Sequence, residues 1–319
     1  MGTAENILIF GGSGFIGTSL CRRLKNSQKY SFKIYDKVIH PSNAELTIIG
    51  CVTNEIIAGP FFNTIINLAA EHRDDVSPSS LYYSVNVDGA KNICTYANLN
   101  NINHIIFTSS VAVYGIDTKT GSSKQPAPFN DYGRSKLMAE NIYLQWQANA
   151  PNTRKLTIIR PTVVFGEGNR GNFYNLFKQI YLNKFLMVGK GANIKSLAYV
   201  ENLSHFLEYC LNNPKSTVTY NYVDTPNLKV IDLIKKIYSI LGRKHLNLHV
   251  PIIIGLTMGK IIDLVSFLSG VKLPVSFVRI KKFCANSEFD DNLPDEFKRP
   301  YQLNEAITKT ILYEIKKFQ

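Results

Sequence analysis

Apolar residues in the first half of the chain gather in short runs, and these runs alternate with longer stretches of helical spacing. The short runs predict buried strands and the longer stretches predict amphipathic helices. Because helices separate successive strands, the pattern predicts βαβ units and a doubly wound parallel sheet of the Rossmann type, in the α/β class. We expect strands at residues 6–10, 32–36, 64–69, 102–109 and 156–160, and helices at 15–24, 81–99 and 132–147.

The pattern is less regular beyond Gly166. Helices are predicted there at 173–183, 200–212, 229–241 and 304–317, with short strands near 185–188 and 219–223. We therefore expect a Rossmann domain at 1–165 and a smaller α/β lobe at 166–319, which is partly interleaved with late elements of the first sheet.

The most apolar later stretch, residues 250–268, contains Lys260 and Asp263. These charges argue against an integral membrane span. We interpret the stretch as a buried or dimer-facing helix, with peripheral membrane contact as the alternative. Glycines interrupt the hydrophobic start of the chain, and the five cysteines are scattered without a C-x-x-C pair. These features predict a cytoplasmic protein with no metal site.

Composition and charge narrow the class of protein. The 319 residues are 45% hydrophobic and 19% charged, which excludes collagen-like, disordered and disulfide-scaffold classes. A net charge of +12 is compatible with nucleic acid, an anionic membrane surface or small phosphorylated ligands. Because the basic residues are dispersed in short groups without a basic arm, we expect no nucleic-acid partner.

A glycine-rich turn follows the first predicted strand and opens the first predicted helix. Its glycines allow a tight turn and let backbone N–H groups approach a pyrophosphate. Asp36 ends the next strand, where a carboxylate can accept hydrogen bonds from ribose hydroxyls and repels a 2'-phosphate. This combination predicts NAD, while the neighbouring Lys37 leaves NADP open. The residues of the turn that we expect to contact the dinucleotide are Gly11, Gly14, Phe15, Ile16 and Gly17.

Tyr132 and Lys136 are four residues apart, which on a helix places both side chains on one face. A tyrosine hydroxyl with its ordinary pKa of about 10 needs a nearby positive charge to act as a base at neutral pH. Lys136 supplies that charge. Ser109 and Ser110 follow a predicted parallel strand, and the carboxyl ends of such strands border the cofactor crevice.

These motifs, taken in order, resemble the extended short-chain dehydrogenase/reductases, and among them the NAD-dependent epimerase/dehydratase family that acts on nucleotide sugars. The matching segments are 11–17, Asp36, 67–70, 86–89, 109–115, 132–136, 160–161 and 199–202. The resemblance implies that Tyr132 is the catalytic acid/base, that Lys136 lowers its pKa and holds the nicotinamide ribose, and that Ser110 binds the reacting sugar oxygen. It also implies a homodimer formed through a helix bundle that includes residues 132–147.

The resemblance implies further contacts to cofactor and substrate. On the substrate side, Lys195 stands where the family commonly has an arginine on the diphosphate, and Arg279 is a candidate for the second cation. Asn172 matches a position that contacts the nucleotide sugar, and His72 lies where a polar residue would be near the substrate. For Arg279 and His72 a surface or structural role is equally open. The further cofactor contacts are Val52, Leu68, Ala69, Ala70 and Asn86.

Two departures from the family pattern bear on the reaction and on the cofactor. Val111 and Ala112 stand where sugar dehydratases have acidic residues, and water elimination needs an acid there, which disfavours a dehydratase. Cys51 and Val52 replace the usual acidic contact to adenine, which leaves the affinity for the adenine end open. We predict an NAD-dependent nucleotide-sugar 4-epimerase of the UDP-hexose type that works through a 4-keto intermediate.

An NAD(P)H-dependent 4-keto-sugar reductase is the alternative. An enzyme for an apolar alcohol, such as a steroid, and a non-catalytic dinucleotide-binding protein are weaker alternatives. A binding protein has no need of the base that Ser110, Tyr132 and Lys136 would form.

Overall fold

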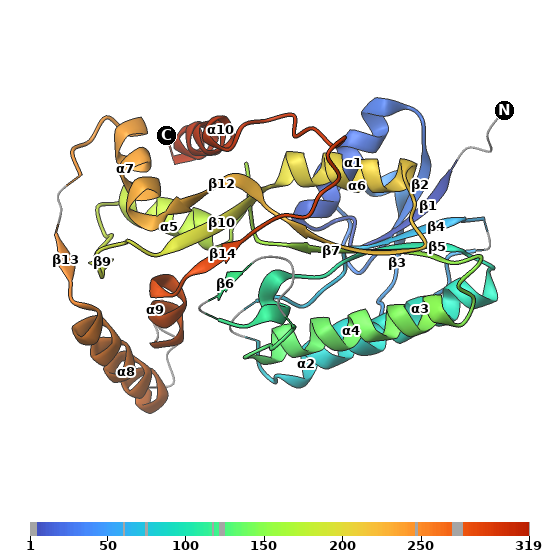
Figure 1. The fold of residues 1–319 in the computed structure, drawn as a ribbon, viewed down its shortest axis with the longest axis horizontal. Helices are drawn as coiled ribbons and strands as arrows, with labels where there is room; N and C mark the ends of the chain where they lie inside the picture. Colours follow the sequence, from blue (N-terminus) through green and yellow to red (C-terminus); the bar gives the residue numbers. More distant parts are fainter. Residues whose placement is uncertain are drawn as a thin grey trace.

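The computed structural model describes residues 5–59, 61–73, 76–116, 118–120, 125–245, 248–269 and 277–318. Its larger sheet has seven parallel strands in the order β11-β7-β5-β4-β1-β2-β3 (Figure 1), which confirms the predicted doubly wound parallel sheet. The strand order reverses between β1 and β4, where sheets of this kind open a crevice at their carboxyl ends. The strands are β1 (Asn6–Phe10), β2 (Ser31–Asp36), β3 (Thr47–Ile49), β4 (Thr64–Asn67), β5 (His104–Thr108), β7 (Lys155–Pro161) and β11 (Thr217–Tyr222).

Helices cover both faces of this sheet. Ile7 and Ile9 of β1 point into one core and Leu8 and Phe10 into the other, because successive strand residues face opposite sides. Helices α1 and α6 pack on the first face, and α3 and α4 on the second (Figure 1). The helices are α1 (Phe15–Ser27), α2 (Ser80–Tyr83), α3 (Gly89–Leu99), α4 (Asp131–Ala148), α5 (Asn172–Tyr181), α6 (Val200–Asn212), α7 (Val230–Ile240), α8 (Ile252–Ser269), α9 (Phe277–Cys284) and α10 (Leu303–Phe318).

A second sheet joins segments from both halves of the chain. Its path is β12-β10-β14-β6, and β8 also pairs with β10. Strands β6 and β8 of the second sheet precede residue 166. Conversely, strand β11 of the second half belongs to the larger sheet, and helix α6 packs on that sheet. The remaining strands are β6 (Thr118–Thr120), β8 (Val163–Phe165), β9 (Met187–Val188), β10 (Ile194–Tyr199), β12 (Asp224–Lys229), β13 (His249–Val250) and β14 (Ser287–Phe289).

The helix predicted at 81–99 is interrupted. Helix α2 leads into a π-helical turn, Ser84–Asp88, before α3 begins. The strand predicted at 64–69 ends earlier, at Asn67, because the chain there turns toward Gly11.

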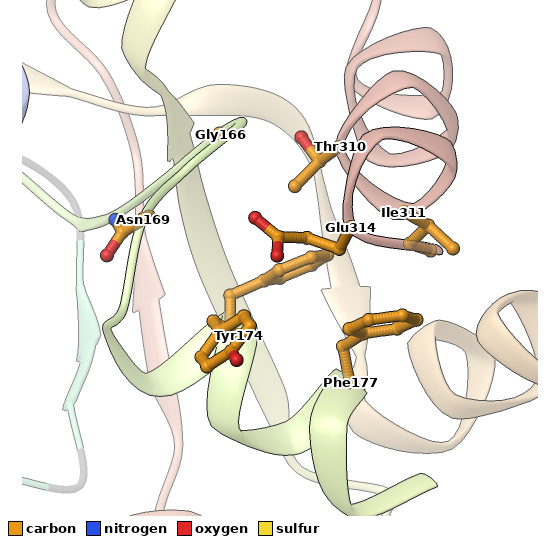
Figure 2. A pocket seen from close by; sticks show the side chains of 8 residues that line it. Gly166, Asn169, Tyr174, Phe177, Thr310, Ile311 and Glu314 are labelled. Carbon is orange, nitrogen blue, oxygen red and sulfur yellow. The ribbon is translucent and has the colours of Figure 1, made fainter. Parts of the chain in front are cut away.

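Helix α10 holds the loop that leads into α5. The buried carboxylate of Glu314 accepts the Gly168 N–H at 3.0 Å and pairs with Arg170 at 2.8 Å. Figure 2 shows Glu314 extending from α10 toward the loop that carries Gly166 and Asn169. The loop is therefore fixed by a charged contact between distant parts of the chain.

Helix α8 contradicts the expectation of a buried helix. Only Gly255 and Gly259 of its 18 residues are buried, whereas Ile253 is 79% exposed. The reason is that α8 packs on β9 and α9 through its glycine-bearing side alone, where an added Cβ would meet Val188 or Phe277. With a mean hydropathy of 1.8, α8 is long and apolar enough to cross a membrane, judged by length and composition only.

Candidate active site

In the glycine-rich turn between β1 and α1, backbone atoms come so close together that Gly11 and Gly17 leave no room for a side chain. Gly11 has a φ of +75°, and an added Cβ would lie 2.6 Å from the backbone nitrogen of Ala69. A Cβ on Gly17 would lie 2.4 Å from the carbonyl oxygen of Gly11. The first turn of α1 carries no acidic residue, and its N-cap, Gly14, has no side chain to occupy the helix N–H groups. The turn therefore fits a bound pyrophosphate.

Asp36 lies beside this turn at the end of β2. Its Oδ2 accepts the Ser13 N–H at 3.0 Å, and its Oδ1 accepts the Val38 N–H at 3.2 Å. A carboxylate has about four acceptor sites, so these two bonds leave capacity for ribose hydroxyls. The ribose contact of Asp36 stays a prediction.

The segment after β4 approaches the same turn. Ala69 donates its N–H to Oδ1 of Asn67 at 3.0 Å and lies against Gly11, and Leu68 and Ala70 flank it. The carbonyl of Val52 accepts a hydrogen bond from the Asn92 side chain at 2.8 Å. The cofactor contacts of these residues stay predictions.

Asn86 connects the crevice edge to the catalytic helix. Its Oδ1 accepts the Glu71 N–H at 3.0 Å, and its Nδ2 donates to the Glu71 carbonyl at 3.1 Å and to Oγ of Ser135 at 2.9 Å. Asn86 thus fixes the strand-end segment relative to α4, and its predicted contact to the cofactor remains a prediction.

The start of α4 is pressed against the segment that follows β5. The Asn130 side chain caps α4 by accepting the Gly133 N–H at 2.9 Å. A Cβ on Gly133 would lie 2.5 Å from the Ala112 carbonyl oxygen, so glycine permits this close approach. Ser110 in turn accepts the Ala112 N–H at 3.1 Å. The packing of α4 on this turn brings the Ser110 segment next to the helix that carries Tyr132.

Lys136 is buried one helical turn beyond Tyr132. Its side chain is 1% exposed, and its Nζ lies 4.2 Å from the centroid of the Phe107 ring. Burial lowers the pKa of Lys136 from its ordinary value of 10.5 to about 7, while the carboxylate of Glu140 acts in the opposite direction. Tyr132 is half-buried, with its ring centroid 6.2 Å from that of Tyr82.

A buried ion pair behind Lys136 was missed by the sequence reasoning. Arg160 binds both carboxylate oxygens of Glu140, at 2.9 and 2.6 Å, and donates to the Tyr114 hydroxyl at 2.6 Å. The position of Glu140, one turn beyond Lys136 on the same face of a helix, is the signal that could have identified it. The pair anchors α4 to β7.

The two predicted diphosphate cations lie together at α9. Lys195, on β10, donates from Nζ to the carbonyls of Lys282 and Ala285, both at 2.7 Å. This ammonium therefore holds the C-terminal end of α9. Arg279 is exposed on α9 itself. Their contact to a diphosphate stays a prediction.

The other two predicted substrate residues lie at the surface. His72 is exposed next to the ion pair of Glu71 with Arg73. Asn172 is exposed at the first position of α5, after the loop that Glu314 holds. The described residues contain no group of three histidine, cysteine or acidic side chains that could hold a metal ion.

Comparisons with known proteins agree with this geometry. An N-acetyl-alpha-D-glucosaminyl-diphospho-ditrans,octacis-undecaprenol 4-epimerase of Escherichia coli O157:H7 is 44% identical, covering 97% of this chain and 95% of the relative. A UDP-glucose 4-epimerase of Vibrio cholerae is 29% identical, covering 83% of this chain and 86% of the relative. A UDP-glucuronic acid 4-epimerase of Bacillus cereus, solved with NAD, shares the fold with a TM-score of 0.76 at 17% identity, covering 99% and 100% of the two chains.

The family model of the NAD-dependent epimerase/dehydratase family matches residues 7–223, which include the glycine-rich turn, Asp36 and the pair Tyr132 and Lys136. The chain therefore belongs to the NAD-dependent epimerase/dehydratase family and is an NAD-dependent enzyme of the short-chain dehydrogenase/reductase type.

Proposed function

We propose that this chain is a 4-epimerase of an N-acetylhexosamine carried on a polyprenyl diphosphate. The observation that carries the chemistry is the buried Lys136 one helical turn beyond Tyr132, beside the segment of Ser110. The carrier and sugar of the proposal come from the relative of Escherichia coli O157:H7, which is similar over nearly its whole length.

The protein's own residues supply the proton chemistry of this reaction. Tyr132 takes the proton of the C4 hydroxyl. It returns a proton to the C4 oxygen after the keto sugar has rotated in the site and presents its opposite face. Lys136 favours the tyrosinate form by charge attraction. NAD, when bound in the glycine-rich turn, supplies the acceptor and donor of the C4 hydride. The same hydride and proton return to the sugar, so the reaction has no net oxidation.

Ser110 is suited to hold the reacting C4 oxygen. Its Oγ accepts the Ala112 N–H, and this leaves the hydroxyl proton available for donation. The neighbouring Val111 and Ala112 offer no acid to protonate a leaving hydroxyl group. The local chemistry thus favours returning the C4 oxygen as a hydroxyl over eliminating water.

A nucleotide sugar of the UDP-hexose type is the second candidate substrate. It is favoured by the similarity to the UDP-glucose 4-epimerase of Vibrio cholerae. Both substrates present a sugar on a diphosphate, so they share the chemistry at C4 and differ in the group on the far side of the diphosphate. The two candidates also differ in the N-acetyl group of the sugar, so a test must vary the carrier and the sugar separately.

The test is a substrate panel with the purified full chain. N-acetylglucosaminyl-diphospho-polyprenol, UDP-N-acetylglucosamine and UDP-glucose are incubated separately, and the sugar product and the absorbance of reduced nicotinamide are followed together. We expect conversion to the C4 epimer with the polyprenyl substrate and no net change in absorbance. Product from UDP-sugars alone would select the second candidate. Stoichiometric consumption of reduced nicotinamide would instead assign a reductase.

A further inference from the structure

Helix α8 presents an uncharged apolar face away from the rest of the chain. A helix on a protein surface normally turns polar residues outward, whereas α8 turns apolar residues outward. The only polar side chain within this face, Thr257, satisfies its hydroxyl by donating to the Ile253 carbonyl at 2.9 Å. The face consists of residues that are between 47% and 79% exposed, namely Ile253, Ile254, Met258, Ile261, Leu264, Val265 and Leu268.

The charged residues of α8 do not interrupt this face. Asp263 accepts the Phe277 N–H at 3.0 Å, at the start of α9. The Nζ of Lys260 lies 5.4 Å from the centroid of the Phe277 ring. Both side chains therefore contact the start of α9. Lys260 is at the same time exposed and lies one helical turn from Leu264, at the edge of the apolar face.

Helix α9, which packs on the glycine-bearing side of α8, adds positive charge to this part of the molecule. Its sequence holds Arg279, Lys281 and Lys282 and no acidic residue. The whole chain carries a net charge of +12. An apolar helical face flanked by cations is the combination that binds the interface of a membrane with anionic headgroups.

The pair of helices also lies close to the candidate active site. The Nζ of Lys282 is 5.6 Å from the centroid of the Phe129 ring, and Phe129 directly precedes Asn130, the cap of catalytic helix α4. Lys195 ties the end of α9 to β10. Figure 1 shows α8 at the outer edge of the molecule, with α9 between it and strands β6 and β14. A surface that docks α8 would thus lie near the N-terminal end of α4, which carries Tyr132.

We propose that the outward face of α8 is a membrane-docking surface, which lies in the headgroup region of a leaflet that contains anionic phospholipids. Its 18 residues make a helix about 27 Å long, which can lie flat along the interface. The inference deepens the function proposed above and rests on it for the substrate: a polyprenyl carrier holds its diphosphate and sugar at the same interface.

Two other arrangements of α8 are disfavoured by charge. In a symmetric contact with a second copy, the same patch meets itself, so the cations of α9 would approach those of the partner. If α8 crossed the bilayer, Lys260 and Asp263 at its middle would enter the hydrocarbon region. Docking along the surface leaves both groups packed on α9.

Flotation of the full-length protein with vesicles tests the proposal. The vesicles are phosphatidylcholine alone or phosphatidylcholine with phosphatidylglycerol. The test variant is Ile253→Asp/Leu268→Asp, at two positions of this face that are 79% and 74% exposed. The control variant is Ile57→Asp/Leu99→Asp, which changes the same residue types at 76% and 75% exposure elsewhere on the surface.

We expect the wild type and the control to float with the anionic vesicles and to dissociate at high salt. The bound fraction of the test variant should fall by about tenfold or more, because both aspartates would enter the apolar boundary. A wild type that stays unbound with anionic vesicles, or a test variant that binds as well as the control, would overturn the proposal. So would a test variant that loses only self-association in sedimentation.

Activity measurements separate this proposal from the proposed function. With a short-chain, water-soluble diphosphate-linked N-acetylglucosamine, the test variant should epimerise as fast as the wild type. With the long-chain substrate embedded in vesicles, it should be slower than the control. A wild type inactive on both carriers would refute the proposed function, whereas the flotation result would still decide whether α8 docks to membranes.

Discussion

Replacing Lys136 with methionine should stabilise the NAD-free protein near neutral pH and abolish turnover. Methionine fills a similar space without a charge, whereas the lysine ammonium is 1% exposed. Burial lowers the pKa of Lys136 from 10.5 to about 7. By linkage this shift destabilises the folded state by about 4 kcal/mol at pH 7 and by about 1 kcal/mol at pH 10.

The sign of the pH dependence follows from the direction of this shift. Because the folded-state pKa lies below the unfolded value, the destabilisation is complete at pH values below about 7. It disappears as the pH rises through 10.5, where the unfolded chain also loses the proton. The free energy of unfolding of the wild type should therefore rise by about 3 kcal/mol, relative to that of Lys136→Met, between pH 7 and pH 10.

Urea unfolding of both proteins, freed of NAD, measures this difference. Comparing the two proteins at each pH cancels the titration of groups that they share, such as the other tyrosines and lysines. The reasoning would be refuted by a Lys136→Met protein that is no more stable than the wild type at pH 7. It would also be refuted by a stability difference that does not change between the two pH values.

Four further variants test the remaining assignments. Tyr132→Phe should keep the fold and bound NAD but lower the rate of epimer formation by about 10²- to 10⁴-fold, and near wild-type turnover would contradict its role. Asp36→Ala should weaken NAD binding in calorimetry more than NADP binding, whereas equal effects would show that this carboxylate does not hold the ribose. Arg160→Met should lower the free energy of unfolding in urea by about 3–5 kcal/mol, because Glu140 stays buried without its partner; Arg160→Met/Glu140→Leu should recover most of the loss.

The fold of the first half could be predicted because its signals are local. Strand β1 has the bounds that the apolar pattern predicts, 6–10, and helix α4, Asp131–Ala148, is within one residue of the predicted 132–147 at each end. The second sheet could not be predicted in the same way. Strands β6, β8 and β14 have three residues each, and each pairs with a segment far away in the sequence, so no local pattern specifies the pairing.

The same distinction applies to the site. The glycines of the turn and the spacing of Tyr132 and Lys136 depend on local geometry, and the structure places them as expected. The partners of Lys195 depend on tertiary packing. Its ammonium donates to backbone carbonyls near the end of α9, and no sequence motif predicts these contacts. Likewise, counting Lys260 and Asp263 along the chain cannot reveal that they turn toward α9.

The ion pair of Glu140 and Arg160 explains why Glu140 does not pair with Lys136. Glu140 lies one helical turn beyond Lys136, a spacing at which lysine and glutamate normally pair. Arg160 instead occupies both carboxylate oxygens of Glu140, at 2.6 and 2.9 Å. The Lys136 ammonium is therefore buried beside a carboxylate that is already neutralised, and burial lowers its pKa. An anion at Tyr132 would relieve that unfavourable burial, so the packing that destabilises the ammonium also favours the tyrosinate on which the proposed proton transfer depends.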